Sequence, residues 1–148
     1  MTTNYRPPST VFTEPYGEPT GPDINVGTCV YSPSRSVKYV MAKNVSATVS
    51  VAGAPAYQAS AVYGEMGKAA DALGPDNCEG AWVAAVPAGG FGYVAVAGAP
   101  INVFGTFSAG DSLTATADVF VAGAIATALI KGKAIDTAAA ALGAARLG

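Results

Sequence analysis

The expected fold is decided by one stretch of sequence, Ala81-Trp-Val-Ala-Ala-Val86, Pro87-Ala-Gly-Gly90, Phe91-Gly-Tyr-Val-Ala-Val96. Two apolar runs rich in valine and aromatic residues flank four residues that include one proline and two glycines. A short glycine-containing loop between two such runs is typical of a β-hairpin. We therefore expect strands at 81–86 and 91–96, joined by a turn at 87–90.

Outward from this hairpin the same pattern of short apolar runs and turns continues. Turn residues recur about every 8–12 positions, the spacing expected of an all-β sandwich or barrel. The length of 148 residues suits one domain, and no internal repeat is visible. The sequence predicts a mainly β domain over residues 26–148, either a small β-barrel or a β-sandwich. Further strands are expected at Val26–Tyr31, Val37–Met41, Ala47–Val51, Ile101–Phe104, Leu113–Ala117, Val119–Val121 and Ile125–Lys131, with turns at Ser32–Ser34, Gly53–Pro55, Gly98–Pro100 and Ser108–Asp111.

Three segments have a less definite pattern. Residues 66–73 predict two helical turns, ended by Gly74-Pro75. Residues 57–63 are ambiguous between structure types. Residues 137–146 are rich in alanine without β-branched neighbours, and alanine has the highest helix propensity. A short helix is one interpretation of this last segment, and a small-residue loop leading to a strand near Leu147 is the other.

Residues 1–25 differ in composition from the rest and form a predicted extended arm. Half of the ten prolines lie here, and proline holds both itself and the preceding residue extended. Ordering such an arm costs more backbone entropy than its few apolar side chains return alone. The arm is therefore either disordered in the free chain or ordered on a neighbour. We expect the second, with Tyr5, Phe12 and Tyr16 as partner-binding residues.

Composition excludes several classes of function. The chain has no histidine, which excludes the Ser-His-Asp triad and histidine-ligated zinc. Charged residues are only 12% and the net charge is −2, so we expect neither nucleic acid nor a membrane surface as a partner. Apolar residues make up 51%. Such a surface is either polar without charge or covered by partners, and we favour covering.

No segment predicts secretion or membrane insertion. The first residues have no apolar signal region. The uncharged run Ala81–Gly110 is long enough to span a bilayer but is broken by glycines and prolines, so β structure is favoured. We expect synthesis in a cytoplasm. There Cys29 and Cys78 are expected to be free and buried rather than bonded to each other, although the sequence leaves their pairing open.

Candidate catalytic and ligand-binding patterns are weak. Gly89-Gly-Phe-Gly92 lacks the spacing of a phosphate-binding loop and fits a hairpin turn. Asp76 and Glu79 could meet around a metal, but a solvated loop is the simpler interpretation. Trp82 is expected in a core or an interface, with exposed sugar stacking as the alternative. We expect no catalytic, cofactor-binding or metal-binding residues, and hence no enzyme.

The second half resembles the capsid cement or decoration proteins of tailed bacteriophages, small head proteins rich in alanine and glycine. The order of segments is similar over roughly residues 80–148. The segments that carry the resemblance are Gly80-Ala-Trp-Val-Ala-Ala-Val-Pro-Ala-Gly89, Gly92-Tyr-Val-Ala-Val-Ala-Gly98, Ala109-Gly-Asp-Ser-Leu113 and Ile130-Lys-Gly-Lys-Ala-Ile-Asp-Thr-Ala-Ala-Ala140. The proline-rich arm departs from the compact members of this family.

The resemblance implies a β-barrel or β-sandwich docked on assembled capsid protein, often as a trimer, and no catalytic residues. The expected function is a virion structural protein on the capsid surface that bridges neighbouring shell subunits. Its partners would be the major capsid protein and copies of itself. The alternative is a tail or head-fibre module that recognises a host sugar or protein, which an exposed aromatic platform around Trp82 or Tyr93 would support.

Overall fold

The computed structural model describes residues 25–34, 36–74, 77–123 and 131–148. The arm residues Tyr5, Phe12 and Tyr16 lie outside these ranges, as does most of the strand predicted at 125–131. The mainly β prediction is confirmed, and so is the barrel. The strands of the described residues are β1 (Cys29–Tyr31), β2 (Val37–Asn44), β3 (Pro55–Gln58), β4 (Glu65–Gly67), β5 (Cys78–Trp82), β6 (Phe91–Phe107), β7 (Ser112–Thr116), β8 (Val119–Ala122), β9 (Gly132–Ala134) and β10 (Ala138–Leu147).

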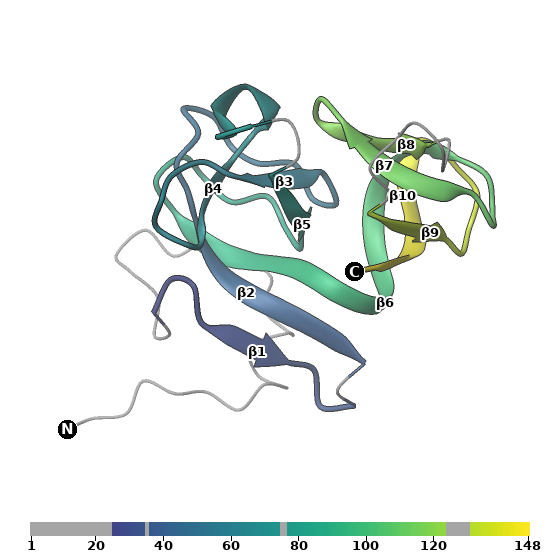
Figure 1. The fold of residues 1–148 in the computed structure, drawn as a ribbon, viewed down its shortest axis with the longest axis horizontal. Helices are drawn as coiled ribbons and strands as arrows, with labels where there is room; N and C mark the ends of the chain where they lie inside the picture. Colours follow the sequence, from purple (N-terminus) through teal and green to yellow (C-terminus); the bar gives the residue numbers. More distant parts are fainter. Residues whose placement is uncertain (1–24, 35, 75–76, 124–130) are drawn as a thin grey trace.

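The strands form two closed barrels of five strands that share β6 (Figure 1). The first barrel runs in the order β2-β4-β3-β5-β6 and closes through β6 pairing with β2. The second runs β6-β8-β7-β9-β10 and closes through β10 pairing with β6. In both, the first and third strands in chain order pair in parallel and all other pairs are antiparallel. The sequence shows no repeat, yet the same topology occurs twice.

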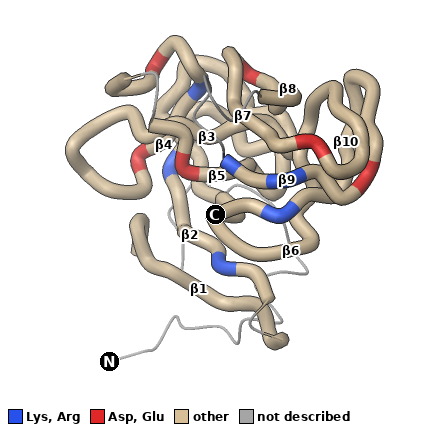
Figure 2. Tube along the Cα trace, turned by 45° about the vertical axis from the view of Figure 1, so that its right-hand side comes forward, with Lys and Arg blue, Asp and Glu red and all other residues tan. Residues whose placement is uncertain are grey.

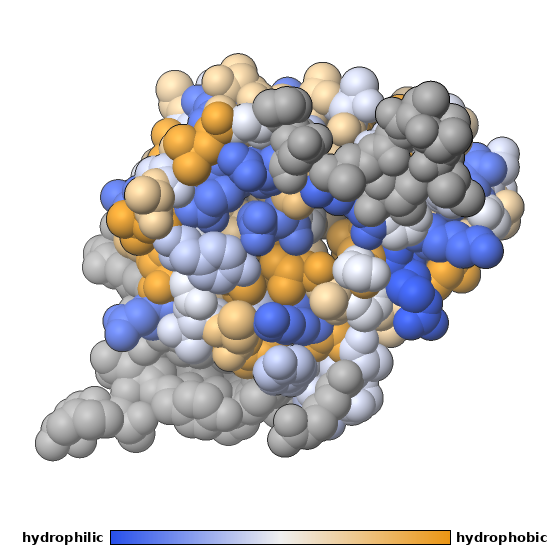
Figure 3. Space-filling model, in the orientation of Figure 1, coloured by the Kyte–Doolittle hydropathy of each residue, from blue (hydrophilic) through white to orange (hydrophobic). Residues whose placement is uncertain are grey.

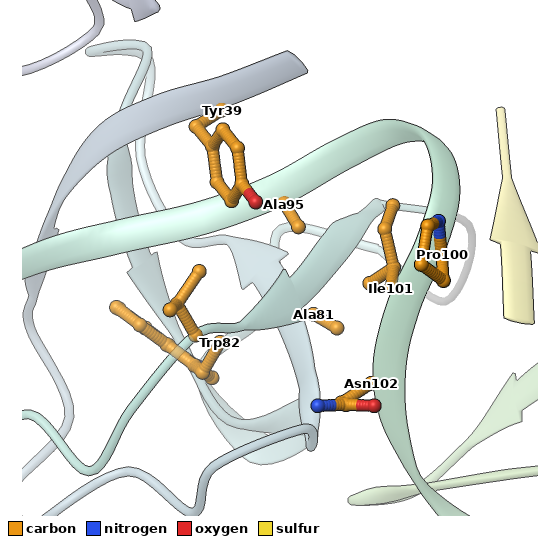
Figure 4. Close-up of a pocket in the computed structure, with 8 residues that line it drawn as sticks. Tyr39, Ala81, Trp82, Ala95, Pro100, Ile101 and Asn102 are labelled. Carbon is orange, nitrogen blue, oxygen red and sulfur yellow. The ribbon is translucent and has the colours of Figure 1, made fainter. Parts of the chain in front are cut away.

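The long strand β6 joins the barrels at Gly98. This residue pairs with Val37 of β2 and with Leu147 of β10. The turn predicted at Gly98–Pro100 is wrong, because β6 continues through it as a strand. Gly98 has a φ of 103° and lies against the backbone of Ser36, a conformation and a close approach that only glycine accommodates easily. The ribbon bends beside Pro100 (Figure 4), so one strand serves both barrels.

Narrow barrels explain the abundance of small residues. Five strands enclose less space than the eight whose interior is just filled by side chains. Gly80 in β5 and Gly132 in β9 occupy matching places, where a Cβ atom would collide with the carbonyl oxygens of Ala95 and Arg146. Large aromatic side chains are still fully buried in both barrels, Trp82 in the first and Phe120 in the second.

The predicted hairpin is present with a longer loop. Ala81 pairs with Ala95 and Trp82 with Val94, but β5 ends at Trp82 instead of residue 86. The segment that follows β5 turns away from β6 because the Val86 N–H donates to the Ser50 hydroxyl at 2.7 Å. The Ser50 N–H in turn donates to the Val86 carbonyl at 2.9 Å.

Three other sequence predictions are wrong in part or in full. Residues 47–51 are a loop, because Asn44 holds it by donating to the Thr48 carbonyl and accepting from the Ser46 N–H. Residues 66–73 contain the end of β4 and one 3₁₀ turn, Ala69–Asp71, instead of two helical turns. Residues 138–147 are neither a helix nor mainly a loop but the strand β10, since pairing with β6 outweighs the helix propensity of alanine.

Candidate interaction surface

The aromatic residues considered for sugar stacking are in the interior. Trp82 is 2% exposed and packs with Val40, Met66 and Val94 in the first barrel. Tyr93 is 8% exposed and forms an edge-to-face contact with Tyr39, their ring centroids 6.5 Å apart. The core prediction for Trp82 is confirmed. Neither ring offers an exposed platform to a sugar.

The two cysteines are free and lie in different environments. Cys78 is buried as expected, whereas Cys29 is exposed, so the prediction of burial is wrong for Cys29. Burial raises the pKa of the Cys78 thiol to about 11. A thiol that stays protonated at neutral pH is a poor nucleophile. Cys78 is therefore a packing residue.

Metal-binding side chains do not gather in the part of the chain that the structure describes. No group of three or more Cys, Asp or Glu side chains in these residues could hold a metal ion, and Asp76 lies outside them. A cavity of about 130 Å³ lies between β2, β5 and β6, lined by Tyr39, Trp82 and Ile101 among others (Figure 4). Another, beside Cys78 and Lys131, measures about 180 Å³. Both are smaller than the roughly 300–1,000 Å³ typical of ligand pockets.

A larger hollow of about 490 Å³ lies between the barrels but carries no charged group among its described lining residues. Its only titratable side chain there is Tyr57, whose hydroxyl donates to the Ala117 carbonyl at 2.6 Å. Burial, with smaller contributions from Cys78 and Asp118, raises the pKa of Tyr57 to about 12. The Tyr57 hydroxyl thus forms a hydrogen bond from one barrel to the other, and it stays protonated well above neutral pH.

Charges are sparse over the described surface. Figure 2 shows Asp and Glu residues spread over the trace, whereas basic residues lie close together around β9, where Lys133 pairs with Arg146. Strand β1 carries no charged residue. Figure 3 shows apolar residues on the surface between polar ones, including some in the hollow between the barrels.

Apolar side chains project from the loop between β2 and β3 and from the neighbouring β10. Ser50 points inward to Val86, so its neighbours Val49 and Val51 face outward, 51% and 47% exposed. Leu142 of β10 is 50% exposed and lies over Gly53 at the end of the same loop. We name Val49, Val51 and Leu142 the loop patch. Exposed apolar side chains grouped on one side of a protein are a feature of protein-binding surfaces.

A second group of exposed residues surrounds β1. Tyr31 is 44% exposed, and Tyr63, 43% exposed, lies against Gly27 just before the strand. Burial of the ring, then the nearby Glu79 and Cys29, raise the pKa of Tyr63. Tyrosine is enriched in protein interfaces because its ring offers apolar area and its hydroxyl a hydrogen bond. We name Cys29, Tyr31 and Tyr63 the β1 edge group.

The sequence did not indicate the loop patch, because Ala47–Val51 had the pattern of a half-buried strand. The exposed valines become recognisable only once Ser50 is known to bond to Val86.

Among the described residues no helix has the length and hydropathy needed to cross a membrane. Comparison of the chain with protein-family models, curated proteins and solved structures finds no match.

Proposed function

We propose that this chain is a structural protein of a tailed-phage virion, which decorates or cements the capsid by bridging neighbouring shell subunits. The observation that carries the proposal is the loop patch, three half-exposed aliphatic side chains on a protein with few charges. The resemblance of residues 80–148 to capsid cement proteins supports the same function. The chain would act by adhesion, with no catalytic, cofactor-binding or metal-binding residues.

The fold supplies what adhesion requires. Two barrels joined by one continuous strand form the base of the loop patch, because β6 pairs with β2 and β5 in its first half and with β10 and β8 in its second half. Many copies on a symmetric shell add their weak contacts through avidity. The proposed partners are the major capsid protein and copies of the chain itself, as a trimer. The arm would add contact area through Tyr5, Phe12 and Tyr16.

No observation favours the alternative of a tail or fibre module that recognises a host surface. That alternative depended on an exposed aromatic platform at Trp82 or Tyr93, and both side chains are buried. We therefore propose only the capsid decoration function.

Co-sedimentation with empty shells of the phage that encodes the chain tests the proposal. The wild-type chain is expected to pellet with the shells at a saturable ratio. A double variant, Val51→Ser with Leu142→Ser, is expected to bind at least about tenfold more weakly, since burying one aliphatic side chain contributes roughly 1.5–3 kcal/mol. Leu73→Ser is the matched control, because Leu73 is 61% exposed and outside the loop patch. Wild-type chain that stays in the supernatant would refute the proposal.

A further inference from the structure

Strand β1 stands apart from the rest of the described sheet. Every other strand of these residues belongs to one of the two closed barrels, and both barrels are complete without β1. β1 pairs with β2 on one side only, through Cys29–Val40, Val30–Tyr39 and Tyr31–Lys38. Closed barrels have no exposed edge, whereas an open edge is a template for another strand.

The hydrogen bonds around β1 show which backbone groups face outward. The Ser32 N–H donates to the Val37 carbonyl at 2.9 Å, and the Met41 N–H donates to the Thr28 carbonyl at 3.0 Å. Partners alternate along an antiparallel pair, so Val30 also faces β2. Cys29 and Tyr31 therefore turn their N–H and C=O groups away from β2, and no strand that the structure describes pairs with them.

The outer edge also lacks the features that normally prevent strand addition. Proteins protect such edges with charged side chains, prolines or bulges. β1 contains none of these, and Cys29 and Tyr31 project exposed side chains beside the open backbone. Its other side chain, Val30, is buried against Met41 and Tyr93. Among the described residues, the outer edge of β1 is thus unpaired, and the strand itself carries no charge.

We propose that residues 9–14 of a neighbouring copy add to this edge as an antiparallel strand. The inference rests on the proposed function, because bridging neighbours is what brings the arm of one copy to another. Twenty-four residues precede Asn25, where the described chain begins, and only residues 1–6 and 9–14 among them form proline-free runs of six residues. Only the second run has four consecutive residues that are β-branched or aromatic, Thr10-Val-Phe-Thr13, which strands favour.

One register satisfies both the backbone and the side chains. With Phe12 opposite Val30, the aromatic ring extends the cluster of Val30, Met41 and Tyr93. Val11 then lies opposite Tyr31, and Thr13 lies opposite Cys29. In this register the backbone groups of Val11 and Thr13 meet the outward N–H and C=O groups of Tyr31 and Cys29. This arrangement also places Phe12, one of the predicted arm contacts, in an interface.

Disulfide trapping between two chains tests the proposal. The first chain carries Thr13→Cys and Cys29→Ser, and the second keeps Thr13 and Cys29. Directly opposed residues on antiparallel strands have Cα atoms about 4.5–5.5 Å apart, within the range for a disulfide. Cys78 can remain, since its thiol is buried and free. Under mild oxidation, in concentrated solution and on shells, we expect a covalent dimer whose bridge links residues 13 and 29, identified by mass spectrometry.

The control replaces Thr13→Cys by Thr3→Cys in the same arm, and it is expected to give at least about fivefold less of the mixed dimer. Absence of the 13–29 bridge under both conditions would overturn the inference. So would a bridge formed only within a single chain that carries both Thr13→Cys and Cys29. Chains that pellet with shells but form no bridge refute this inference and leave the proposed function standing. A bridge in solution supports the inference whatever the shell assay shows.

A proline pair gives an independent readout. Val11→Pro removes an N–H that faces β1 in the proposed register, whereas Thr10→Pro removes one that faces away. We expect Val11→Pro to lower cross-linking between residues 13 and 29 by at least about fivefold relative to Thr10→Pro. Equal cross-linking in both variants would contradict the proposed register.

Discussion

At the residue scale, glycines mark the places where backbones touch. Gly105 of β6 pairs with Phe120 of β8, and a Cβ atom there would collide with the Phe120 carbonyl. We predict that Gly105→Ala lowers the free energy of unfolding by at least about 3 kcal/mol, because the parallel pair must separate to admit the methyl group. Urea unfolding measures the change.

Gly89 is the matched control for this substitution. A Cβ atom at Gly89 meets nothing within 4 Å, and its φ of 76° is the only cost. Gly89→Ala is therefore expected to lose about 1 kcal/mol. Similar losses at Gly89 and Gly105 would show that β6 and β8 do not approach as closely as described.

Tyr57 makes the stability depend on pH. Its pKa is raised from 10.0 to about 12, mainly by burial. The folded chain therefore holds this proton more tightly than the unfolded chain. The resulting stability is fully present below about pH 10 and is lost as pH rises through about pH 12.

The variant Tyr57→Phe isolates this contribution. At neutral pH it loses the bond to the Ala117 carbonyl, worth about 1 kcal/mol. Between pH 10 and 12 it is expected to lose less further stability than the wild type. Urea midpoints measured along that pH range test this. Parallel curves for the two proteins would mean that Tyr57 titrates normally in the folded chain.

At the scale of elements, Trp82 at the end of β5 is an internal probe of the first barrel. It is the single tryptophan and is 2% exposed. We predict blue-shifted fluorescence that resists a soluble quencher such as iodide or acrylamide, because the indole is surrounded by apolar side chains. Emission near that of free tryptophan, readily quenched in the native protein, would contradict the packing of β5.

The sequence predicts the elements whose signals are local. The alternation around residues 37–41, the glycine-containing turn before β6 and the apolar run at residues 119–121 each correspond to a strand or turn of the structure. Trp82 is also correctly expected in the core. Alternation and turn residues suffice here because neighbours in sequence supply the pairing partners.

The elements that the sequence did not predict depend on distant partners. β10 is a strand because β6 pairs with it, although alanine alone favours a helix. β6 continues as a strand through Gly98 and Pro100 because the two barrels meet there. The loop patch requires the bonds between Ser50 and residues 84 and 86. None of these contacts leaves a periodic signal, so neither the duplicated barrel nor the exposed valines were predictable.

At the scale of the whole molecule, the shared strand couples the two barrels. Val94 lies in the half of β6 that faces the first barrel and Val103 in the half that faces the second, and both are fully buried. We predict that Val94→Ala and Val103→Ala each lower the urea midpoint of the entire protein, by about 2 kcal/mol in free energy.

Two probes distinguish cooperative unfolding of the entire protein from independent unfolding of the two barrels. Trp82 fluorescence reports on the first barrel, and far-UV circular dichroism reports on both. Coincident transitions in wild type and in both variants are expected of one cooperative unit. A Val103→Ala protein whose circular dichroism shifts while its Trp82 transition stays in place would show that the barrels unfold separately.

In the proposed function, the chain covers and bridges capsid subunits, with the two barrels as the base and the arm as an additional contact. Removal of residues 1–24 should then leave Trp82 fluorescence unchanged and weaken attachment to shells. Full attachment by the truncated chain would refute the role of the arm while leaving the barrels as the adhesive part.

Electron microscopy of shells of the proposed phage, imaged with and without the purified protein, tests the proposed bridging function most directly. We expect added density on the outer surface, at symmetry-related positions that span neighbouring subunits, into which the double barrel fits with the loop patch against the shell. Shells that look identical with and without saturating protein would contradict the proposed function.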